Sequence, residues 1–279
     1  MGPLITATAL AEALGAGPGR TIVLDVRYRT GGGSGVEEYA TGHVPGAAYV
    51  DLDAGLAAPP SRDGGRHPLP EGGAFGAAMR RVGVRRDRPV VVYDDWGGRA
   101  AARAWWLLRF HGHRDVRVLD GGLACWVAGG GALETTHLDV TAGDFEPEPG
   151  HLRVVDADQV PEVTVLVDAR APERYRGDVE PIDAVAGHIP GAVNVPTERN
   201  LAADGRFHSA GDLAEIYAAV GATAGADVAA YCGSGVTAAH DVLALAIAGV
   251  DAALYPGSWS GWITDPDRPV VTPACRHRT

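Results

Sequence analysis

Short apolar runs alternate along this chain with longer stretches of helical periodicity. The expected strands and helices of the first half are a helix at 6–14, a strand at 21–24, a strand at 48–50, a helix at 73–82, a strand at 89–93, a helix at 99–110, a strand at 116–119 and a helix at 121–126. Apolar runs of four or five residues between helices are typical of parallel strands with both faces covered. The pattern predicts an α/β fold, in which a parallel sheet is flanked by helices on both faces.

The second half of the sequence repeats the first in order and at nearly constant spacing. The turn Gly42-His43-Val44-Pro45-Gly46-Ala47 returns as Gly187-His188-Ile189-Pro190-Gly191-Ala192, and the strand ending at Asp25-Val26-Arg27 returns as Asp168-Ala169-Arg170. Tyr231-Cys232 falls where Tyr93-Asp94 falls. We therefore predict two copies of one domain, at 1–131 and 152–279, joined by a linker at 132–151.

Cys232 lies between a buried strand at 228–231 and an apolar helix that runs to about Gly249. Gly233 and Gly235 let backbone amides of the connecting loop turn inward, and the loop leads into a helix N-terminus. Free amides and the helix dipole favour an anion there, so a thiolate is stabilised and can act as a nucleophile. Cys232 is the predicted catalytic residue, and the second domain is the predicted catalytic one.

The other two cysteines lack such a setting. Cys125 is expected to be a small buried apolar residue, and Cys275 lies in a polar tail and is expected to be an exposed bystander. The chain contains no Cys-x-x-Cys pair, so neither a structural zinc site nor a disulfide framework is expected.

Composition and charge exclude several classes of function. The net charge of −11 argues against general binding to nucleic acid or to an anionic membrane. All 24 basic residues are arginine. Without lysine, neither Schiff-base chemistry nor a phosphate-loop lysine is available, and the run Gly31 to Gly35 is not a nucleotide loop. With no signal peptide or membrane segment, we expect a soluble, cytoplasmic protein.

Taken together, the paired Gly-His-Val/Ile-Pro-Gly-Ala turns, the segment Tyr231-Cys232-Gly233-Ser234-Gly235-Val236-Thr237-Ala238 and Gly257-Ser258-Trp259 resemble the tandem rhodanese-like sulfurtransferases. The resemblance covers nearly the whole chain. It implies two rhodanese-like domains, of which only the second is catalytic, and Asp94 at the cysteine position of the first fits that arrangement. It also implies that Cys232 takes a sulfur atom from a small-molecule donor, becomes a persulfide and passes the sulfur to cyanide or a thiol. The resemblance further implies that no metal and no organic cofactor is required.

The loop after the cysteine is similar to that of 3-mercaptopyruvate sulfurtransferases, whereas thiosulfate sulfurtransferases more often carry basic residues there. Mercaptopyruvate has one carboxylate and a carbonyl, which suit an arginine fork and neutral donors, and thiosulfate is a compact dianion. We therefore predict mercaptopyruvate as the donor, with thiosulfate as the alternative. The loop residues predicted to contact the substrate are Gly233, Ser234, Gly235, Val236 and Thr237.

The resemblance also assigns residues outside the loop. Arg174 matches the family's carboxylate-binding arginine, but the place of the second arginine is taken by Ile182, which weakens the mercaptopyruvate assignment. From the first half of the chain, Asp53 and His67 match acidic and imidazole positions that assist near the cysteine.

Residues that occur in both copies are predicted to maintain the fold, because only one copy carries the cysteine. These are His43 and His188, and the pairs Asp25/Arg27 and Asp168/Arg170. Trp105 and Trp106 are expected in the core or at the domain interface. For Trp259, packing and pocket lining both stay open.

Three alternative functions are a cysteine phosphatase, a non-catalytic binding module and a persulfide relay. A cysteine phosphatase would need an arginine six residues after the cysteine, where this chain has Ala238. In a non-catalytic binding module the cysteine would be incidental, and the intact cysteine loop and Arg174 argue against this function. A relay that passes persulfide sulfur to a sulfur-carrier protein leaves no signature in the sequence and stays open.

Overall fold

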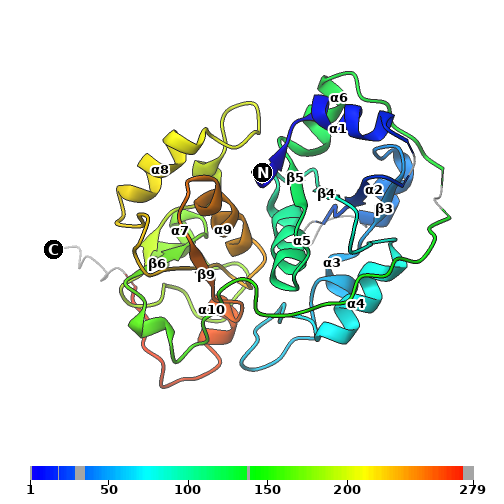
Figure 1. Ribbon diagram of the computed structural model, residues 1–279. Coiled ribbons are helices and arrows are strands. Elements are labelled where there is room, and N and C mark those ends of the chain that lie inside the picture. The colour runs from blue at the N-terminus through cyan, green and yellow to red at the C-terminus, as the bar shows by residue number, and fades with distance from the viewer. Residues whose placement is uncertain (1, 18, 29–34, 137–138, 273–279) are drawn as a thin grey trace. The chain divides into compact units, whose positions relative to one another are not determined.

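The computed structural model describes residues 2–17, 19–28, 35–136 and 139–272 (Figure 1). The elements of the first half are β1 (Leu4–Ile5), α1 (Ala7–Gly15), β2 (Ile22–Asp25), α2 (Gly35–Thr41), β3 (Ala47–Tyr49), α3 (Leu52–Gly55), α4 (Gly72–Arg81), β4 (Val90–Tyr93), α5 (Arg99–Phe110), β5 (Val116–Leu119) and α6 (Gly122–Ala128). Those of the second half are η1 (Val160–Glu162), β6 (Val165–Asp168), α7 (Pro172–Arg176), β7 (Val193–Asn194), η2 (Thr197–Asn200), α8 (Ala210–Ala218), β8 (Val228–Tyr231), α9 (Ala238–Ile247), β9 (Ala252–Leu254) and α10 (Ser258–Trp262).

The expected strands and helices of the first half are present, with small shifts at their ends. Thr6 caps α1 as expected, because its hydroxyl accepts the amide of Ala9 at 3.2 Å. Three elements differ from the prediction: the strand β1, the helix α2 and the short helix α3, which forms at residues 52–55 where the sequence predicts a loop. The Asp51 carboxylate accepts the amide of Ala54 at 2.8 Å and so begins this helix. The glycine run 31–34 lies outside the described residues.

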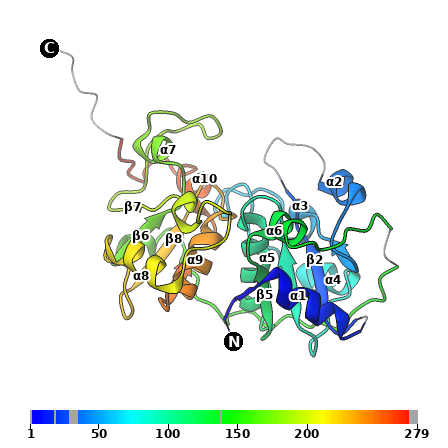
Figure 2. The ribbon, with the colours of Figure 1, turned by 90° about the horizontal axis from the view of Figure 1, so that it is seen from above.

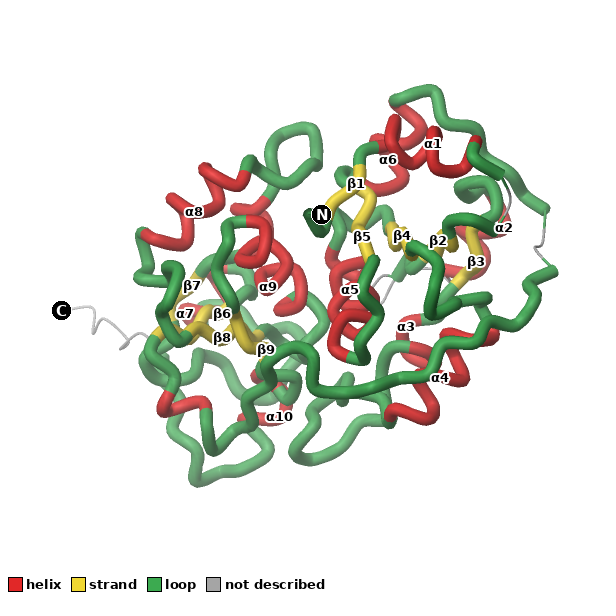
Figure 3. The backbone as a smooth tube through the Cα atoms, viewed as in Figure 1, coloured by secondary structure: helices red, strands yellow, loops and turns green. Residues whose placement is uncertain are grey.

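In the described part of the chain the strands form two parallel sheets, one of five strands in the order β1-β5-β4-β2-β3 and one of four in the order β7-β6-β8-β9. Figure 3 shows α1 and α6 on one face of the first sheet and α3, α4 and α5 on the other. In the second sheet, α8 and α9 cover one face and α10 the other (Figures 2 and 3). The α/β prediction, with helices on both faces of each sheet, is confirmed.

The central strand β8 of the second sheet packs against helices on both of its faces. In the second sheet, Ala229 and Tyr231 of β8 belong to a buried cluster with Trp259 and Trp262 of α10, while α9 packs against β8 and β9. Trp105 and Trp106 of α5 are buried, as expected for packing residues. Within the described residues, every helix is too short or too polar to cross a lipid bilayer.

The chain separates into two compact units that exchange short segments. One unit comprises Met1–Ala58, Leu69–Arg153 and Leu201–Ser209, and the other comprises Pro59–Pro68, Val154–Asn200 and Ala210–Thr279. The expected linker at 132–151 belongs to the first unit, in which the amide of Phe145 donates to the carbonyl of Val84 at 3.2 Å. The loop 59–68, although it comes from the first half of the sequence, belongs to the unit that contains Cys232.

An aspartate–arginine pair lies at the end of the equivalent strand in each unit. Arg27 binds both carboxylate oxygens of Asp25 and donates to the carbonyl of Gly42 at 2.8 Å. Arg170 binds both oxygens of Asp168 and donates to the carbonyl of Gly187 at 2.7 Å. Each pair is buried and links the repeated glycine turn of its unit to the sheet. This is the structural role predicted from the duplication.

The duplicated histidines also have equivalent surroundings. His43 stacks on Tyr39 and bonds its carbonyl oxygen through Nδ1 at 2.9 Å. His188 stacks on Tyr175 and bonds its carbonyl oxygen through Nδ1 at 2.7 Å. The same contacts in both units support the prediction that these residues maintain the fold.

Candidate active site

Cys232 directly follows β8, at the carboxyl end of the second sheet, and its loop leads into α9. The side chain is 1% exposed. The amide of Gly235 donates to Cys232 Sγ at 3.1 Å. Gly235 has φ +80°, and a Cβ atom there would lie 2.5 Å from the carbonyl oxygen of Pro256. Only glycine fits this position without strain or displacement, so the loop geometry that aims this amide at the sulfur depends on it.

The first residues of α10 form hydrogen bonds with the backbone of Cys232. Ser258 Oγ accepts the amide of Cys232 at 3.1 Å and donates to the carbonyl of Tyr255 at 2.9 Å. The amide of Trp259 donates to the carbonyl of Cys232 at 2.9 Å. Ser258 has φ +52°, a conformation that costs energy for a residue with a side chain. Its hydroxyl therefore holds the cysteine backbone from a strained position.

Asp94 shows what the equivalent loop of the first unit binds. Its carboxylate accepts the amides of Trp96 at 2.9 Å, Gly98 at 2.8 Å and Ala101 at 2.9 Å. Burial raises the pKa of this carboxyl group, and the backbone hydrogen bonds oppose that rise. The loop and helix start thus form a cradle of amides for an anion, and the first unit fills its own cradle with a side chain.

His67 and Ser234 meet beside the cysteine. His67 Nδ1 lies 2.7 Å from Ser234 Oγ. The loop 59–68 that carries His67 is fastened to the same unit by the amide of Arg66, which donates to Ser260 Oγ at 3.1 Å. The structure thus brings together two of the residues selected from the sequence, although they are far apart along the chain.

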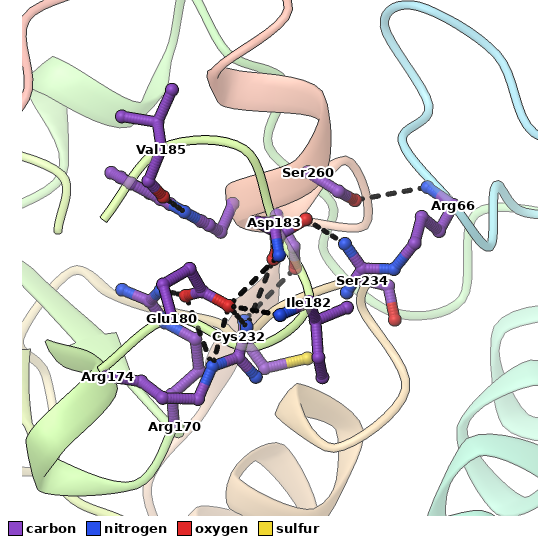
Figure 4. A network of polar contacts seen from close by, with 12 residues as sticks. Arg66, Arg170, Arg174, Glu180, Ile182, Asp183, Val185, Cys232, Ser234 and Ser260 are labelled. Carbon is purple, nitrogen blue, oxygen red and sulfur yellow. Dashed lines mark hydrogen bonds and ion pairs between the residues drawn. The ribbon is translucent and has the colours of Figure 1, made fainter. Parts of the chain in front are cut away.

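Arg174 of α7 belongs to a network of partly buried charges (Figure 4). Its Nη2 lies 2.7 Å from Glu180 Oε1 and 3.0 Å from Asp183 Oδ2, and its Nε also bonds Glu180. Asp183 Oδ1 forms an ion pair with Arg66 Nη1. Both arginines lie against the cysteine loop, because a Cβ atom at Gly233 would be 3.0 Å from Arg66 Nη2 and 3.5 Å from Arg174 Nη1.

The remaining sequence-selected residues are placed as follows. Val236 is buried and Thr237 stands at the N-cap position of α9. Ile182 is 47% exposed, so the place at which the family resemblance implies a second arginine holds an apolar side chain at the surface. Asp53 is exposed in the first turn of α3, in the other unit. Its predicted assisting role stays a prediction.

Trp259 and Cys125 have packing roles. Trp259 is fully buried, with the Arg170 guanidinium 4.7 Å from its ring centre and its Nε1 donating to the carbonyl of Val185 at 2.9 Å. Of the two possibilities left open by the sequence, the structure favours packing. Cys125 is a buried thiol of α6, as predicted, and Cys275 lies outside the described residues. Among the described residues, no group of three or more His, Cys, Asp and Glu side chains is arranged to hold a metal ion.

Sequence reasoning missed Arg66, Asp183 and Ser258. The signal for Arg66 was its position next to His67, which had already been selected. Asp183 adjoins Ile182, where an arginine was sought and an acid was not. Ser258 was part of a recognised motif, but its bond to the cysteine backbone needs the fold.

Fold and site together define a class of protein: a duplicated parallel α/β enzyme with one cysteine in an amide-lined loop, set for transfer of a group through sulfur. The model of the rhodanese-like domain matches twice, at residues 6–129 and 154–265. The chain therefore belongs to the rhodanese-like family, and it is a sulfurtransferase.

Two curated relatives match the chain along almost its whole length. SseB of Mycobacterium tuberculosis, provisionally named a thiosulfate sulfurtransferase, is 48% identical over 273 residues and is covered to 96%, as is this chain. A Pseudomonas aeruginosa protein, provisionally named a 3-mercaptopyruvate sulfurtransferase, is 45% identical over 280 residues, with 96% of this chain and 98% of the relative covered.

Among solved structures, the 3-mercaptopyruvate sulfurtransferase SseA of Escherichia coli superposes with a TM-score of 0.80 at 33% identity. The match covers 93% of this chain and all of SseA. The relatives thus carry two different donor names, and the choice of donor depends on the chemistry of the site itself.

Proposed function

We propose that the chain transfers sulfur from 3-mercaptopyruvate to a thiol or cyanide through a persulfide of Cys232. The observation that carries this proposal is the arrangement at one loop: the buried Cys232 sulfur accepts the amide of Gly235, and the Arg174 guanidinium lies against the adjacent Gly233. A thiolate cradle next to an arginine suits a donor that has sulfur at one end and a carboxylate at the other.

The first half-reaction breaks one bond and forms one. The Cys232 thiolate attacks the donor sulfur, the carbon–sulfur bond breaks, and its electron pair leaves on pyruvate as the enolate. The new sulfur–sulfur bond leaves Cys232 as a persulfide that keeps the proton of the donor thiol. The enolate takes one proton from solvent or from the site to become pyruvate.

In the proposed mechanism, Ser234 and His67 assist the leaving enolate. The Ser234 hydroxyl, 2.7 Å from His67 Nδ1, is the neutral donor of the loop that an oxygen developing negative charge requires. In the second half-reaction the acceptor attacks the outer sulfur of the persulfide, and the sulfur–sulfur bond breaks with its electron pair on Cys232. The Cys232 thiolate is regenerated and the proton of the outer sulfur leaves with the product or to solvent, which gives ping-pong kinetics. No metal or organic cofactor takes part in this scheme.

The test compares mercaptopyruvate and thiosulfate as donors to cyanide, with intact mass measured after the donor alone. We expect faster transfer from mercaptopyruvate and one added sulfur atom, which is absent in Cys232→Ser. Cys125→Ser is the matched control, because that thiol is buried in the other unit. Turnover by Cys232→Ser would refute the persulfide route, and a clear preference for thiosulfate would reverse the choice of donor.

A further inference from the structure

Each arginine of the site already has a carboxylate partner. Arg170 is held by Asp168 and by the carbonyl of Gly187, so it is part of the fold. Arg174 is bound by Glu180. The third carboxylate, Asp183, lies between two guanidinium groups, with one oxygen on Arg66 and the other on Arg174 (Figure 4).

The two carboxylates on Arg174 differ in how firmly they are held. Glu180 receives two nitrogens of Arg174 and also the amides of Ile182 at 3.2 Å and Asp183 at 3.1 Å. Burial alone would raise the pKa of Glu180, and these hydrogen bonds outweigh it, so that its pKa lies below the ordinary value. The Asp183 side chain receives one nitrogen from each of two arginines, and burial raises its pKa. Asp183 is therefore the more readily displaced carboxylate.

We propose that Arg66 and Arg174 together bind the carboxylate of the donor, and that Asp183 occupies this arginine pair as an internal anion until the donor displaces it. The proposal rests on the proposed function, whose donor is a monocarboxylate. Arg66 then takes the part of the second arginine that the chain lacks at Ile182, and it reaches the site from the loop 59–68 instead of the segment before the glycine turn.

The position of the pair fits a donor whose sulfur must reach Cys232. A Cβ atom at Gly233 would lie 3.0 Å from Arg66 Nη2 and 3.5 Å from Arg174 Nη1, and Gly233 is the residue next to the cysteine. Its missing side chain leaves room for the two guanidinium groups beside the loop. Both guanidinium groups therefore lie next to the residue that follows Cys232.

Exchange of one carboxylate for another also bears on donor choice. When a donor monocarboxylate replaces the Asp183 side chain between Arg66 and Arg174, the charge between the two arginines is unchanged. A dianion such as thiosulfate would place a second negative charge beside Glu180, which remains on Arg174. Because like charges repel more strongly in a partly buried site than in water, the arrangement favours the keto acid.

The test measures binding of pyruvate, which cannot transfer sulfur, to the Cys232→Ser protein by calorimetry. In that background we expect Arg66→Gln to weaken pyruvate binding by about tenfold or more, the loss of one charge-assisted hydrogen bond, and Asp183→Asn to tighten it by roughly tenfold. The double variant should show no gain from Asp183→Asn, because the position that Asp183 vacates no longer has its second arginine. Methyl pyruvate, the neutral ester, should respond to neither change.

Asp178→Asn is the matched control for Asp183→Asn. Asp178 is an exposed acid in the same segment and pairs with Arg176 instead of an arginine of the site. An unchanged pyruvate affinity in Arg66→Gln, or in Asp183→Asn, would overturn the proposal, provided thermal unfolding shows both proteins folded. Asp183→Ser replaces Asp183→Asn if the latter does not fold, with the same expected gain.

These outcomes are separate from failure of the proposed function. Absence of sulfur transfer from mercaptopyruvate by the protein with Cys232 intact would refute the proposed function, whatever the pyruvate affinities. If sulfur transfer proceeds normally but pyruvate affinity is unchanged by Arg66→Gln and Asp183→Asn, only the proposal of the arginine pair is refuted.

Discussion

Gly235→Ala tests the link between the backbone of the cysteine loop and the reactivity of Cys232. Two effects act on the variant. The backbone of the alanine must adopt φ +80°, and its Cβ atom would lie 2.5 Å from the carbonyl oxygen of Pro256. A left-handed conformation costs about 1–2 kcal/mol for a non-glycine residue, and overpacking adds about 1–3 kcal/mol. We expect the free energy of unfolding to fall by about 2–5 kcal/mol.

Gly249→Ala separates the two effects. Gly249 follows α9 with φ +78°, nearly the same as Gly235, but a Cβ atom there would meet nothing within 4 Å. This control should therefore lose only about 1–2 kcal/mol. The difference between the two variants in urea denaturation measures the contact with Pro256, because the backbone conformation is common to both.

The loop shift in Gly235→Ala should also remove the amide from Cys232 Sγ. A hydrogen bond to a charged group contributes about 1.5–3 kcal/mol, so persulfide formation should slow by roughly 10- to 100-fold. Intact mass after a short exposure to donor measures this rate, and alkylation by iodoacetamide gives an independent measure of thiolate reactivity. The role assigned to Gly235 would be wrong if two results were found together. Gly235→Ala would have the same free energy of unfolding as Gly249→Ala, and it would form the persulfide as fast as the unaltered protein.

Three further variants test other parts of the structure. Ser258→Ala leaves the buried amide of Cys232 without its acceptor, which should cost about 1–3 kcal/mol in urea denaturation. Asp168→Asn breaks a buried ion pair and should cost about 3–5 kcal/mol. Asp178→Asn removes an exposed ion pair and should cost only about 0–1 kcal/mol. Equal losses of stability in Asp168→Asn and Asp178→Asn would contradict the claim that burial makes the Asp168 pair more important. Burial lowers the pKa of His111 to about 4, so the unfolded chain binds a proton more readily as the pH falls below 6.5. The free energy of unfolding of the unaltered protein should therefore fall between pH 6.5 and 4 by up to about 3 kcal/mol more than that of His111→Phe. An equal fall in both proteins would show that His111 is not the cause.

Much of the fold could be predicted because its signals are local. Each apolar run at 21–24, 89–93 and 116–119 is flanked by helical periodicity, and strands buried on both faces need little more than such a run. The repeated glycine turns then showed that the pattern occurs twice. The short helix α3 was missed because one capping aspartate, Asp51, decides it, and four residues have no helical periodicity of their own.

The candidate site could be predicted only in part. Cys232 and its loop are continuous in sequence, so motif and chemistry coincide. Arg174 and His67 came from the resemblance to a family and from matched positions. Arg66 was not selected, because the search for a second arginine followed the relatives' position along the chain to Ile182.

The sequence by itself determined the α/β order of elements, the duplication and the single cysteine loop, since each depends on residues that are neighbours along the chain. Only the tertiary structure decided which charges face that loop. Arg66, Arg174 and Asp183 come from segments separated by more than a hundred residues at the widest, and side-chain ion pairs between such segments follow no periodicity. The folded chain brings them together because the loop 59–68 packs in the unit that contains Cys232, and that packing is a property of the whole fold.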